Sequence, residues 1–94
     1  MKVKWLARAL ANLTAEADYI AKESPENAKA FVRHVLASVE QLKDYPELGR
    51  AGRVAGTREL VVTSYSYIIP YRIKTATIEI LRVFHTSRKW PGNF

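Results

Sequence analysis

The first 45 residues alternate between hydrophobic and polar positions with two different periods. Residues 1–5 alternate at every second position, which predicts a short strand. Beyond them, apolar residues recur at steps of three and four, the spacing of one face of an amphipathic helix. The predicted stripe of this first helix contains Leu6, Leu10, Leu13, Ala17 and Ile20.

A second helix is predicted directly after the first. Ser24 is a residue type that caps helix N-termini, and Pro25 fits the first helical position. The helix should end near Tyr45, because Pro46 disfavours helical geometry in the residue before it. The link between the helices is short, so they are expected to form an antiparallel hairpin. The apolar stripe of the second helix contains Ala28, Phe31, Val35, Val39 and Leu42.

After residue 57 the period changes to two, and β-branched and aromatic residues become common. Residues 58–63, 67–73 and 78–84 are predicted strands. Short polar breaks of hairpin length separate them, so they should form an antiparallel meander. Pro70 cannot donate a hydrogen bond to a neighbouring strand. It therefore predicts either a bulge or a position whose amide side faces away from a neighbour.

These elements predict an α+β fold with the order β-α-α-β-β-β. The helical hairpin is expected to pack on one face of a small antiparallel sheet and to leave the other face for a partner. The chain has 94 residues, and domains commonly contain roughly 100 to 150 residues. One domain spanning residues 1–94 is therefore expected.

Composition narrows the possible chemistry. The chain has no cysteine, which removes disulfides, thiol nucleophiles and thiolate metal sites. Its two histidines, His34 and His85, do not have metal-ligand spacing, so neither a metal nor another cofactor is expected. The sequence has no apolar run of about 18 residues and no leader pattern. We therefore expect a soluble, cytoplasmic protein with no membrane partner.

The positive charge of the chain lies in its second half. Residues 1–49 contain as many Lys and Arg as Asp and Glu, whereas residues 50–94 contain eight Lys and Arg against Glu59 and Glu79. The formal net charge of +6 therefore belongs to the predicted strands and their loops. Such a field suits an anionic partner, either nucleic acid or an acidic protein. A basic surface that only keeps a small protein soluble is an equally good interpretation.

The strand arginines have a structural interpretation beside a functional one. If the strands are regular, alternation places Arg82 on the side of Ile80 and Phe84, and Arg72 on the side of Ile68 and Pro70. These arginines need not share a face, and some are expected to pair with acidic residues across the sheet. Arg50 and Arg53 lie in the glycine-bearing loop 46–57, where they either touch an anion or remain solvated.

The order of several short motifs resembles a known family. A helical hairpin ends in Pro46-Glu-Leu-Gly-Arg50, and strands follow with the sequences Gly56-Thr-Arg-Glu-Leu-Val-Val62 and Tyr67-Ile-Ile-Pro-Tyr-Arg72. The last motifs are Ile80-Leu-Arg-Val-Phe-His85 and Arg88-Lys-Trp-Pro91. Together they resemble the RelE/ParE superfamily of bacterial toxins from type II toxin–antitoxin systems. The resemblance implies a toxin that a cognate antitoxin wraps and silences.

That superfamily contains two activities. RelE-type members cut messenger RNA in the ribosomal decoding site, whereas ParE-type members poison DNA gyrase. RelE places lysines on its second strand and an arginine on its third. When that pattern is aligned through Tyr71, Glu59 and Val61 occupy the lysine positions and Ile68 the arginine position. Only Arg88 falls near a basic position of the C-terminal segment. These departures argue against RelE-type catalysis.

The resemblance therefore favours a ParE-like toxin that inhibits DNA gyrase without a hydrolytic site. Its expected partners are gyrase and a small acidic antitoxin laid over the helical hairpin and the sheet edge. The candidate residues for target binding are Arg58, Arg72, Arg82, His85, Arg88, Lys89 and Trp90.

Two alternatives remain open at this point. The first is a RelE-like, ribosome-dependent mRNA endoribonuclease in which His85 and Arg88 act as acid/base and phosphate-binding groups, since the imidazole pKa lies near neutrality. One imidazole with arginines is a weak signature, and the preferred interpretation is that His85 orients the C-terminal segment or contacts a partner. The second alternative is a non-toxic remnant or a plain nucleic-acid-binding module.

Overall fold

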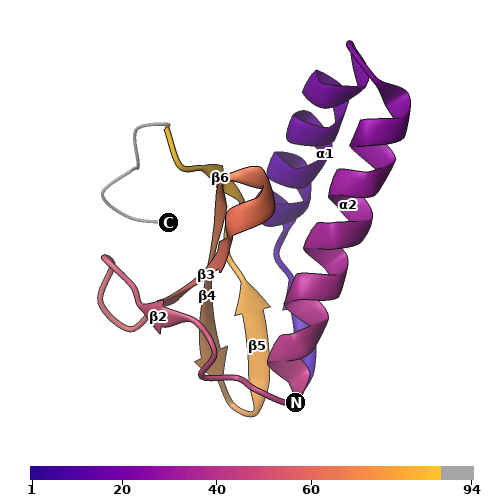
Figure 1. Ribbon diagram of the computed structural model, residues 1–94. Coiled ribbons are helices and arrows are strands. Elements are labelled where there is room, and N and C mark those ends of the chain that lie inside the picture. Colours follow the sequence, from indigo (N-terminus) through magenta and orange to yellow (C-terminus); the bar gives the residue numbers. More distant parts are fainter. Residues whose placement is uncertain (88–94) are drawn as a thin grey trace.

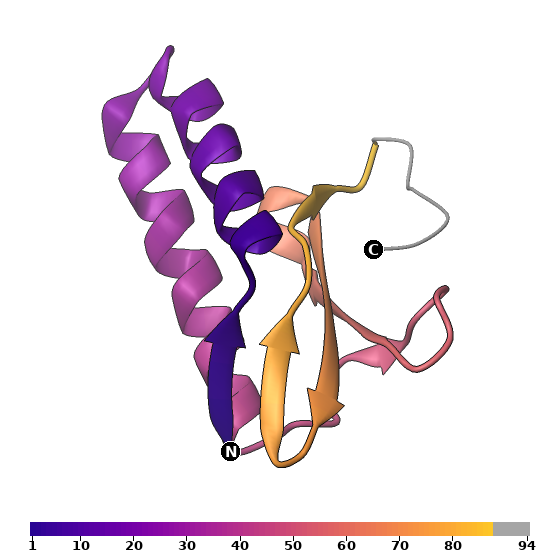
Figure 2. The same ribbon diagram turned by 180° about the vertical axis from the view of Figure 1, so that it is seen from behind.

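A computed structural model shows two helices packed on a mixed sheet, and it describes residues 1–87. The chain begins with strand β1 (Lys2–Trp5), followed by α1 (Ala7–Ala21) and α2 (Pro25–Glu40). A short 3-10 turn, η1 (Gln41–Lys43), extends the second helix. Figures 1 and 2 show the two helices side by side as an antiparallel hairpin on one side of the sheet. The predicted α+β class and helical hairpin are confirmed.

The remaining strands build most of the sheet. They are β2 (Arg50–Ala51), β3 (Arg58–Val62), β4 (Tyr67–Lys74), β5 (Thr77–Ile80) and β6 (Phe84–His85), with a 3-10 turn, η2 (Thr63–Tyr65), between β3 and β4. The strand order is β1-β5-β4-β3-β2, and β6 also pairs with β4. The predicted meander is confirmed, because β3, β4 and β5 are antiparallel neighbours. The sheet as a whole is mixed rather than antiparallel, since β1 runs parallel to β5.

The third predicted strand is interrupted opposite Pro70. Tyr71 pairs with Ile80, whereas Ile68 pairs with Phe84. Three residues, 81–83, therefore face two on β4, which is the arrangement of a β-bulge. The bulge predicted in the strand of Pro70 is not found there, because β4 runs unbroken from Tyr67 to Lys74 and the extra residue lies on the neighbouring strand. The Pro70 carbonyl still accepts a hydrogen bond from the Leu81 N–H at 2.9 Å.

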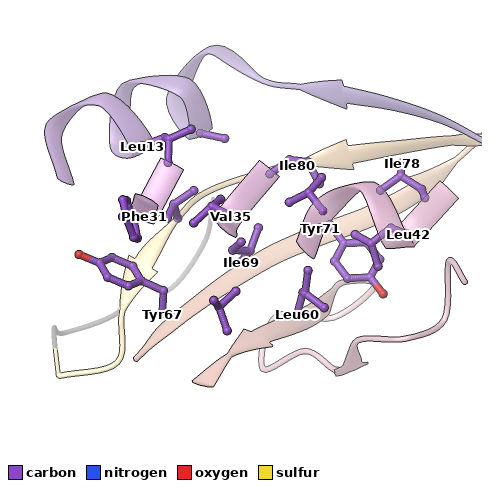
Figure 3. Packing of buried hydrophobic residues seen from close by; sticks show 14 residues of the cluster. Leu13, Phe31, Val35, Leu42, Leu60, Tyr67, Ile69, Tyr71, Ile78 and Ile80 are labelled. Atoms are coloured by element: carbon purple, nitrogen blue, oxygen red, sulfur yellow. The ribbon is translucent and has the colours of Figure 1, made fainter. Parts of the chain in front are cut away.

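The hydrophobic core lies between the helical hairpin and one face of the sheet (Figure 3). The predicted stripe of α2 is confirmed, because all five of its residues are buried. The predicted stripe of α1 is wrong by a partial turn: Leu10 is 49% exposed, whereas Glu16 is 4% exposed. The core-facing residues of α1 are Ala9, Leu13 and Glu16, with Ile20 packed beside them.

The face of the sheet that points away from the helices is not wholly open. Alternation along β4 places Ile69 and Tyr71 in the core and Ile68 and Pro70 on the opposite, outer face. Ile68 is nevertheless only 5% exposed, and Pro70 is fully buried. The expectation that this whole face is free for a partner is therefore wrong at the centre of β4.

A buried tyrosine fixes the segment that connects the helices to the sheet. The Tyr71 hydroxyl donates to the Pro46 carbonyl at 2.7 Å and accepts from the Gly49 N–H at 2.8 Å. A Cβ on residue 49 would lie 2.6 Å from the Tyr71 ring, so only glycine allows this approach. Burial raises the pKa of Tyr71 above its usual 10.0, and the phenol stays a donor.

The β4–β5 hairpin has the expected length but an unusual composition. Thr75 and Ala76 both have positive φ angles, 49° and 57°. Two-residue hairpin loops of this geometry favour Asn-Gly, because glycine and asparagine adopt positive φ at low cost. Neither residue is of that type, so the loop was predictable from its position between two strands and not from its residues.

No helix within residues 1–87 has the length and apolar character needed to cross a membrane.

The two hydrogen bonds of the Tyr71 hydroxyl lead to a testable prediction. Replacing Tyr71 by Phe leaves the Gly49 N–H buried without its acceptor, which should lower the free energy of unfolding by about 1–3 kcal/mol. Urea denaturation of Tyr71→Phe measures this loss. Tyr45→Phe is the matched control, because Tyr45 is 67% exposed. Equal stability of the two variants would contradict the structural role of the Tyr71 hydroxyl.

Candidate functional site

The first two arginines proposed from the sequence are engaged in structural contacts. Arg58 lies on β3, and its Nη1 donates to the Gly49 carbonyl at 2.9 Å and to the Glu47 carbonyl at 3.4 Å. Arg72 lies directly opposite Glu79 on β5, and its Nε donates to the Glu79 carboxylate at 2.6 Å. The predicted pairing of arginines with acidic residues across the sheet is confirmed for Arg72 and Glu79.

Arg82 is held against helix α1 rather than in a strand. It lies in the bulge, where its Nε donates to Asn12 Oδ1 at 2.9 Å and its guanidinium stacks 4.8 Å from the Phe84 ring centroid. The same Asn12 oxygen accepts the Val83 N–H at 3.1 Å. Asn12 thus fastens the bulge to α1. Because the strand is interrupted, Arg82 is separated from Ile80, which lies in the core.

His85 lies at the end of β6 beside a tyrosine. Its ring packs edge to face against the Tyr67 ring, with centroids 5.1 Å apart and an interplanar angle of 86°. Its Nδ1 accepts from the Ser87 N–H at 3.2 Å and lies 2.7 Å from the Ser87 Oγ. These contacts support the interpretation that His85 orients the chain that follows it. Arg88, Lys89 and Trp90 lie outside the described residues and stay predictions.

A buried carboxylate near His85 was missed from the sequence. Glu16 accepts a hydrogen bond from the Tyr67 hydroxyl at 2.6 Å, and both residues are buried. Together with His85 they line a pocket of about 370 Å³ beside the C-terminal half of α1. The signal in the sequence was the spacing of Leu13, Glu16 and Ile20, which is helical. A carboxylate in that pattern is normally assigned to solvent, and only its partner explains its burial.

A buried charged cluster lies on the outer face of the sheet. Glu59 is 2% exposed, and both of its carboxylate oxygens are bonded. Arg50 donates to Oε1 through Nε at 3.2 Å and through Nη2 at 3.1 Å. Arg53 donates to Oε2 through its backbone N–H at 2.9 Å and through Nε at 3.1 Å. The loop cations are therefore anchored rather than merely solvated, which the sequence did not reveal.

The electrostatics of Glu59 follow from these contacts. Burial alone would raise the pKa of Glu59, because it disfavours the charged form. Hydrogen bonds from the backbone and side chain of Arg53 and from the side chain of Arg50 outweigh burial, and they hold the pKa of Glu59 below its usual 4.5. The carboxylate is therefore ionised at neutral pH and fixes the two guanidinium groups on the sheet.

Other kinds of site are not formed by the described residues. Within residues 1–87, no group of three or more His, Asp or Glu side chains is arranged to hold a metal ion. The imidazole of His34 lies on α2, 5.2 Å from the ring of Tyr65. The arrangement on the outer face can bind anions through arginines, but its central group is an anion itself.

The arrangement of helices, sheet and basic loop has known counterparts. Residues 3–90 match the family model described as the ParE toxin of the type II toxin–antitoxin system parDE. The chain belongs to the ParE toxin family. It is thus a toxin of a type II toxin–antitoxin system within the ParE/RelE superfamily, as the sequence motifs predicted.

Two curated relatives match nearly the whole chain, and one of them carries a RelE name. Over 90 residues the toxin is 42% identical to Y4kP of Sinorhizobium fredii, a protein described as a candidate toxin, and the match covers 96% of this chain and 93% of the relative. It is 39% identical over 87 residues to toxin RelE2 of Caulobacter vibrioides, covering 93% and 97% of the two chains.

Solved structures of toxin–antitoxin systems share the fold. The chromosomal ParDE system from P. aeruginosa contains a chain that superposes with a TM-score of 0.76 at 32% identity, covering 93% of this chain and 97% of the other. The RelBE2 toxin–antitoxin complex of Mycobacterium tuberculosis matches with a TM-score of 0.58 at 26% identity, covering 89% and 95%. Membership of the family sets the class of the toxin, and its target has to be inferred from its own residues.

The Glu59 cluster predicts a pH-dependent loss of stability. Replacing Glu59 by Gln removes the charge that Arg50 and Arg53 neutralise, and it should lower the free energy of unfolding by about 1–3 kcal/mol at pH 7. The native pKa of Glu59 lies below 4.5, so its contribution is complete above pH 4.5 and is lost as the pH falls through the native pKa. The stability difference from wild type should therefore shrink below pH 4.5.

Urea denaturation of wild type and Glu59→Gln at several pH values measures this dependence. Glu23→Gln is the control, because Glu23 is exposed at the end of α1. A stability difference that stays constant between pH 7 and the acid range would contradict the assignment of an ionised, arginine-bound Glu59.

Proposed function

We propose that the toxin inhibits DNA gyrase: it binds the enzyme, stalls the complex in which DNA is cleaved, and so blocks replication. The observation that carries this proposal is the state of Glu59. It occupies a position where RelE-type cleavage uses a cation, and it is a buried carboxylate that binds the two nearest loop arginines. Val61 and Ile68, at the other two positions, are apolar.

The chemistry of RNA cleavage explains why this matters. Cleavage through the ribose 2′-hydroxyl needs a general base, a general acid and cations that stabilise the charge of the phosphorane. On the outer face, the guanidinium groups of Arg50 and Arg53 face a carboxylate and not an open position. Arg58 and Arg82 are engaged by the loop carbonyls and by Asn12. These contacts favour a surface that grips a partner in the cytoplasm without hydrolysing it.

Expression of the toxin in bacteria separates the two activities. Induction should produce double-strand breaks and an SOS response while transcripts remain intact, and co-expression of the cognate antitoxin should abolish both effects. Sequencing of RNA ends and measurement of an SOS reporter in the same cultures provide the readouts. Transcripts cut within codons on translating ribosomes, without DNA breaks, would refute gyrase inhibition and support the endoribonuclease.

We further propose that the antitoxin covers the helical hairpin and the free edge of β3. On the hairpin, a groove of about 480 Å³ runs between α1 and α2, with Ala17, Ala21 and Val32 among its apolar lining residues. Leu10 and Leu36 are 49% and 45% exposed on the same helices. An amphipathic helix of the antitoxin fits such a groove.

The sheet edge offers a second contact for the same antitoxin. Strand β2 pairs only with Arg58 and Glu59, so the outer edge of β3 has no partner among residues 1–87 beyond that point. A groove of about 310 Å³ lies there, lined in part by Leu48, Leu60 and Val61. An exposed strand edge accepts an extended peptide by backbone pairing, and an acidic one would also meet the net positive charge of this half of the chain.

A charge added to the exposed apolar surface of the hairpin should weaken antitoxin binding. Leu36→Asp buries a carboxylate in an apolar contact, and loss of a central apolar anchor costs about 2 kcal/mol or more, which is more than a tenfold increase in Kd. Ala37→Asp is the matched control, because it adds the same charge one position away on an exposed flank of α2. Calorimetric titration with the antitoxin measures both. Equal affinities would place the antitoxin elsewhere.

A further inference from the structure

We propose that the outer face of β1, β5 and β4 binds the phosphate backbone of duplex DNA through Lys2, Lys4, Arg72 and Lys74. This inference rests on the proposed function only for the identity of the ligand in the cell, which would be the DNA held by gyrase. The surface itself is defined by strand register and charge. Of its four cations, the sequence indicated only Arg72 as a candidate.

Strand register brings these four cations together. Lys4 pairs with Glu79, and Glu79 pairs with Arg72, so these three residues form one row across β1, β5 and β4. Lys2, Thr77 and Lys74 form the next row in the same way. Figure 2 shows the three strands side by side. Residues paired in register point to the same face of a sheet, so the two rows make one surface.

This surface lies on the side of the sheet away from the helices. Val3 and Trp5 pack against the core, and Ile78 and Ile80 belong to it. The residues that alternate with them therefore face outward. All four cations of the two rows are exposed, as expected for this face: Lys2, Lys4, Arg72 and Lys74.

The surface carries a strong positive field. It holds four cations and one carboxylate, that of Glu79, so its formal charge is +3. The hydrogen bond from Arg72, together with the charges of Arg72, Lys74 and Lys4, holds the pKa of Glu79 below its usual 4.5. Glu79 thus remains ionised and fixes the Arg72 guanidinium, while the lysines point their charges into solvent. A compact positive field of this kind attracts polyanions.

The composition of the surface favours nucleic acid over an acidic protein. Protein interfaces are anchored by buried aromatic or aliphatic side chains, whereas DNA-binding surfaces are polar and strongly positive. The outward positions of these two rows contain no large apolar residue, since Ile73 and Met1 alternate to the helix side. Most exposed apolar residues of the described chain lie instead on or after the helices and near the β3 edge, and the partly exposed Met1 and Ile73 alternate with the cations rather than standing in their rows.

Salt-dependent binding to a fluorescent DNA duplex tests the proposal. Each phosphate contact contributes about −0.9 to the slope of log K against log salt, so the wild-type slope should reach about −3 or steeper. Lys2→Gln/Lys4→Gln should weaken binding to duplexes of any sequence and reduce the magnitude of the slope by about 2. Lys22→Gln/Lys29→Gln, which removes the same charge from exposed positions on or beside the helices, should leave the slope at the wild-type value.

Several outcomes would overturn the proposal. They are equal slopes for the two double variants, tighter binding of the wild type to single-stranded RNA than to duplex DNA, and loss of antitoxin affinity in Lys2→Gln/Lys4→Gln with DNA binding unchanged. The last result would assign the surface to an acidic protein. An unchanged thermal midpoint and antitoxin affinity would show that the double variant is folded.

The test separates this proposal from gyrase inhibition. If wild-type toxin traps the gyrase cleavage complex but Lys2→Gln/Lys4→Gln binds DNA as wild type does, the DNA surface is wrong and the gyrase function stands. If wild-type toxin binds duplex DNA with the expected slope but does not trap gyrase, the surface stands and the proposed target is wrong.

Discussion

The outer half of the structure depends on one buried carboxylate. Glu59 lies on the outer face of the sheet with almost no exposure, and it faces Arg50 on β2 and Pro70 on β4. A buried charge is costly unless it is paired and hydrogen-bonded. The loop 50–57 supplies both requirements by folding Arg50 and Arg53 onto the carboxylate. Glu59 therefore fixes the orientation of two guanidinium groups and holds the loop that carries them against the sheet.

On the helix side of the sheet, two tyrosine hydroxyls hold neighbouring segments through hydrogen bonds. Tyr71 binds the segment that leaves the second helix, and Tyr67 binds Glu16 on α1. Both are on β4, the central strand, so this strand packs against the hairpin through apolar residues and bonds α1 and the 46–49 segment through hydroxyl groups. The same strand contributes Ile68 and Pro70 to the outer face. The geometry of the toxin is thus organised around β4, and its cations are distributed to either side of that strand.

The elements that sequence patterns predicted well are those whose side chains have one dominant preference. The apolar stripe of α2, the serine cap at Ser24 and the antiparallel meander required only periodicity and turn chemistry. The predicted apolar stripe of α1 omitted Glu16, because periodicity alone assigns a carboxylate to the solvent-facing side of a helix. Nothing in the local sequence indicates that a tyrosine 51 positions away will bind it.

The sequence predicted the positive charge of the candidate site but not which of its cations form contacts. The surplus of arginines and lysines after residue 50 was correctly read as a property of the sheet half. Which of them are engaged depends on register, because Arg72 meets Glu79 only through the β4–β5 pairing, and the bulge places Arg82 beside Asn12. The parallel pairing of β1 is equally invisible in a five-residue segment, although it brings Lys2 and Lys4 next to β5.

A toxin that grips gyrase and a toxin that cuts messenger RNA give different products in a reconstituted reaction. Purified toxin is added to gyrase, supercoiled plasmid and ATP, and in parallel to translating ribosomes with a defined messenger RNA. If the toxin inhibits gyrase, linear plasmid with covalently attached protein accumulates in the first reaction and the messenger RNA of the second remains intact. Codon-phased cleavage of the messenger RNA, with no linear plasmid, would contradict gyrase inhibition.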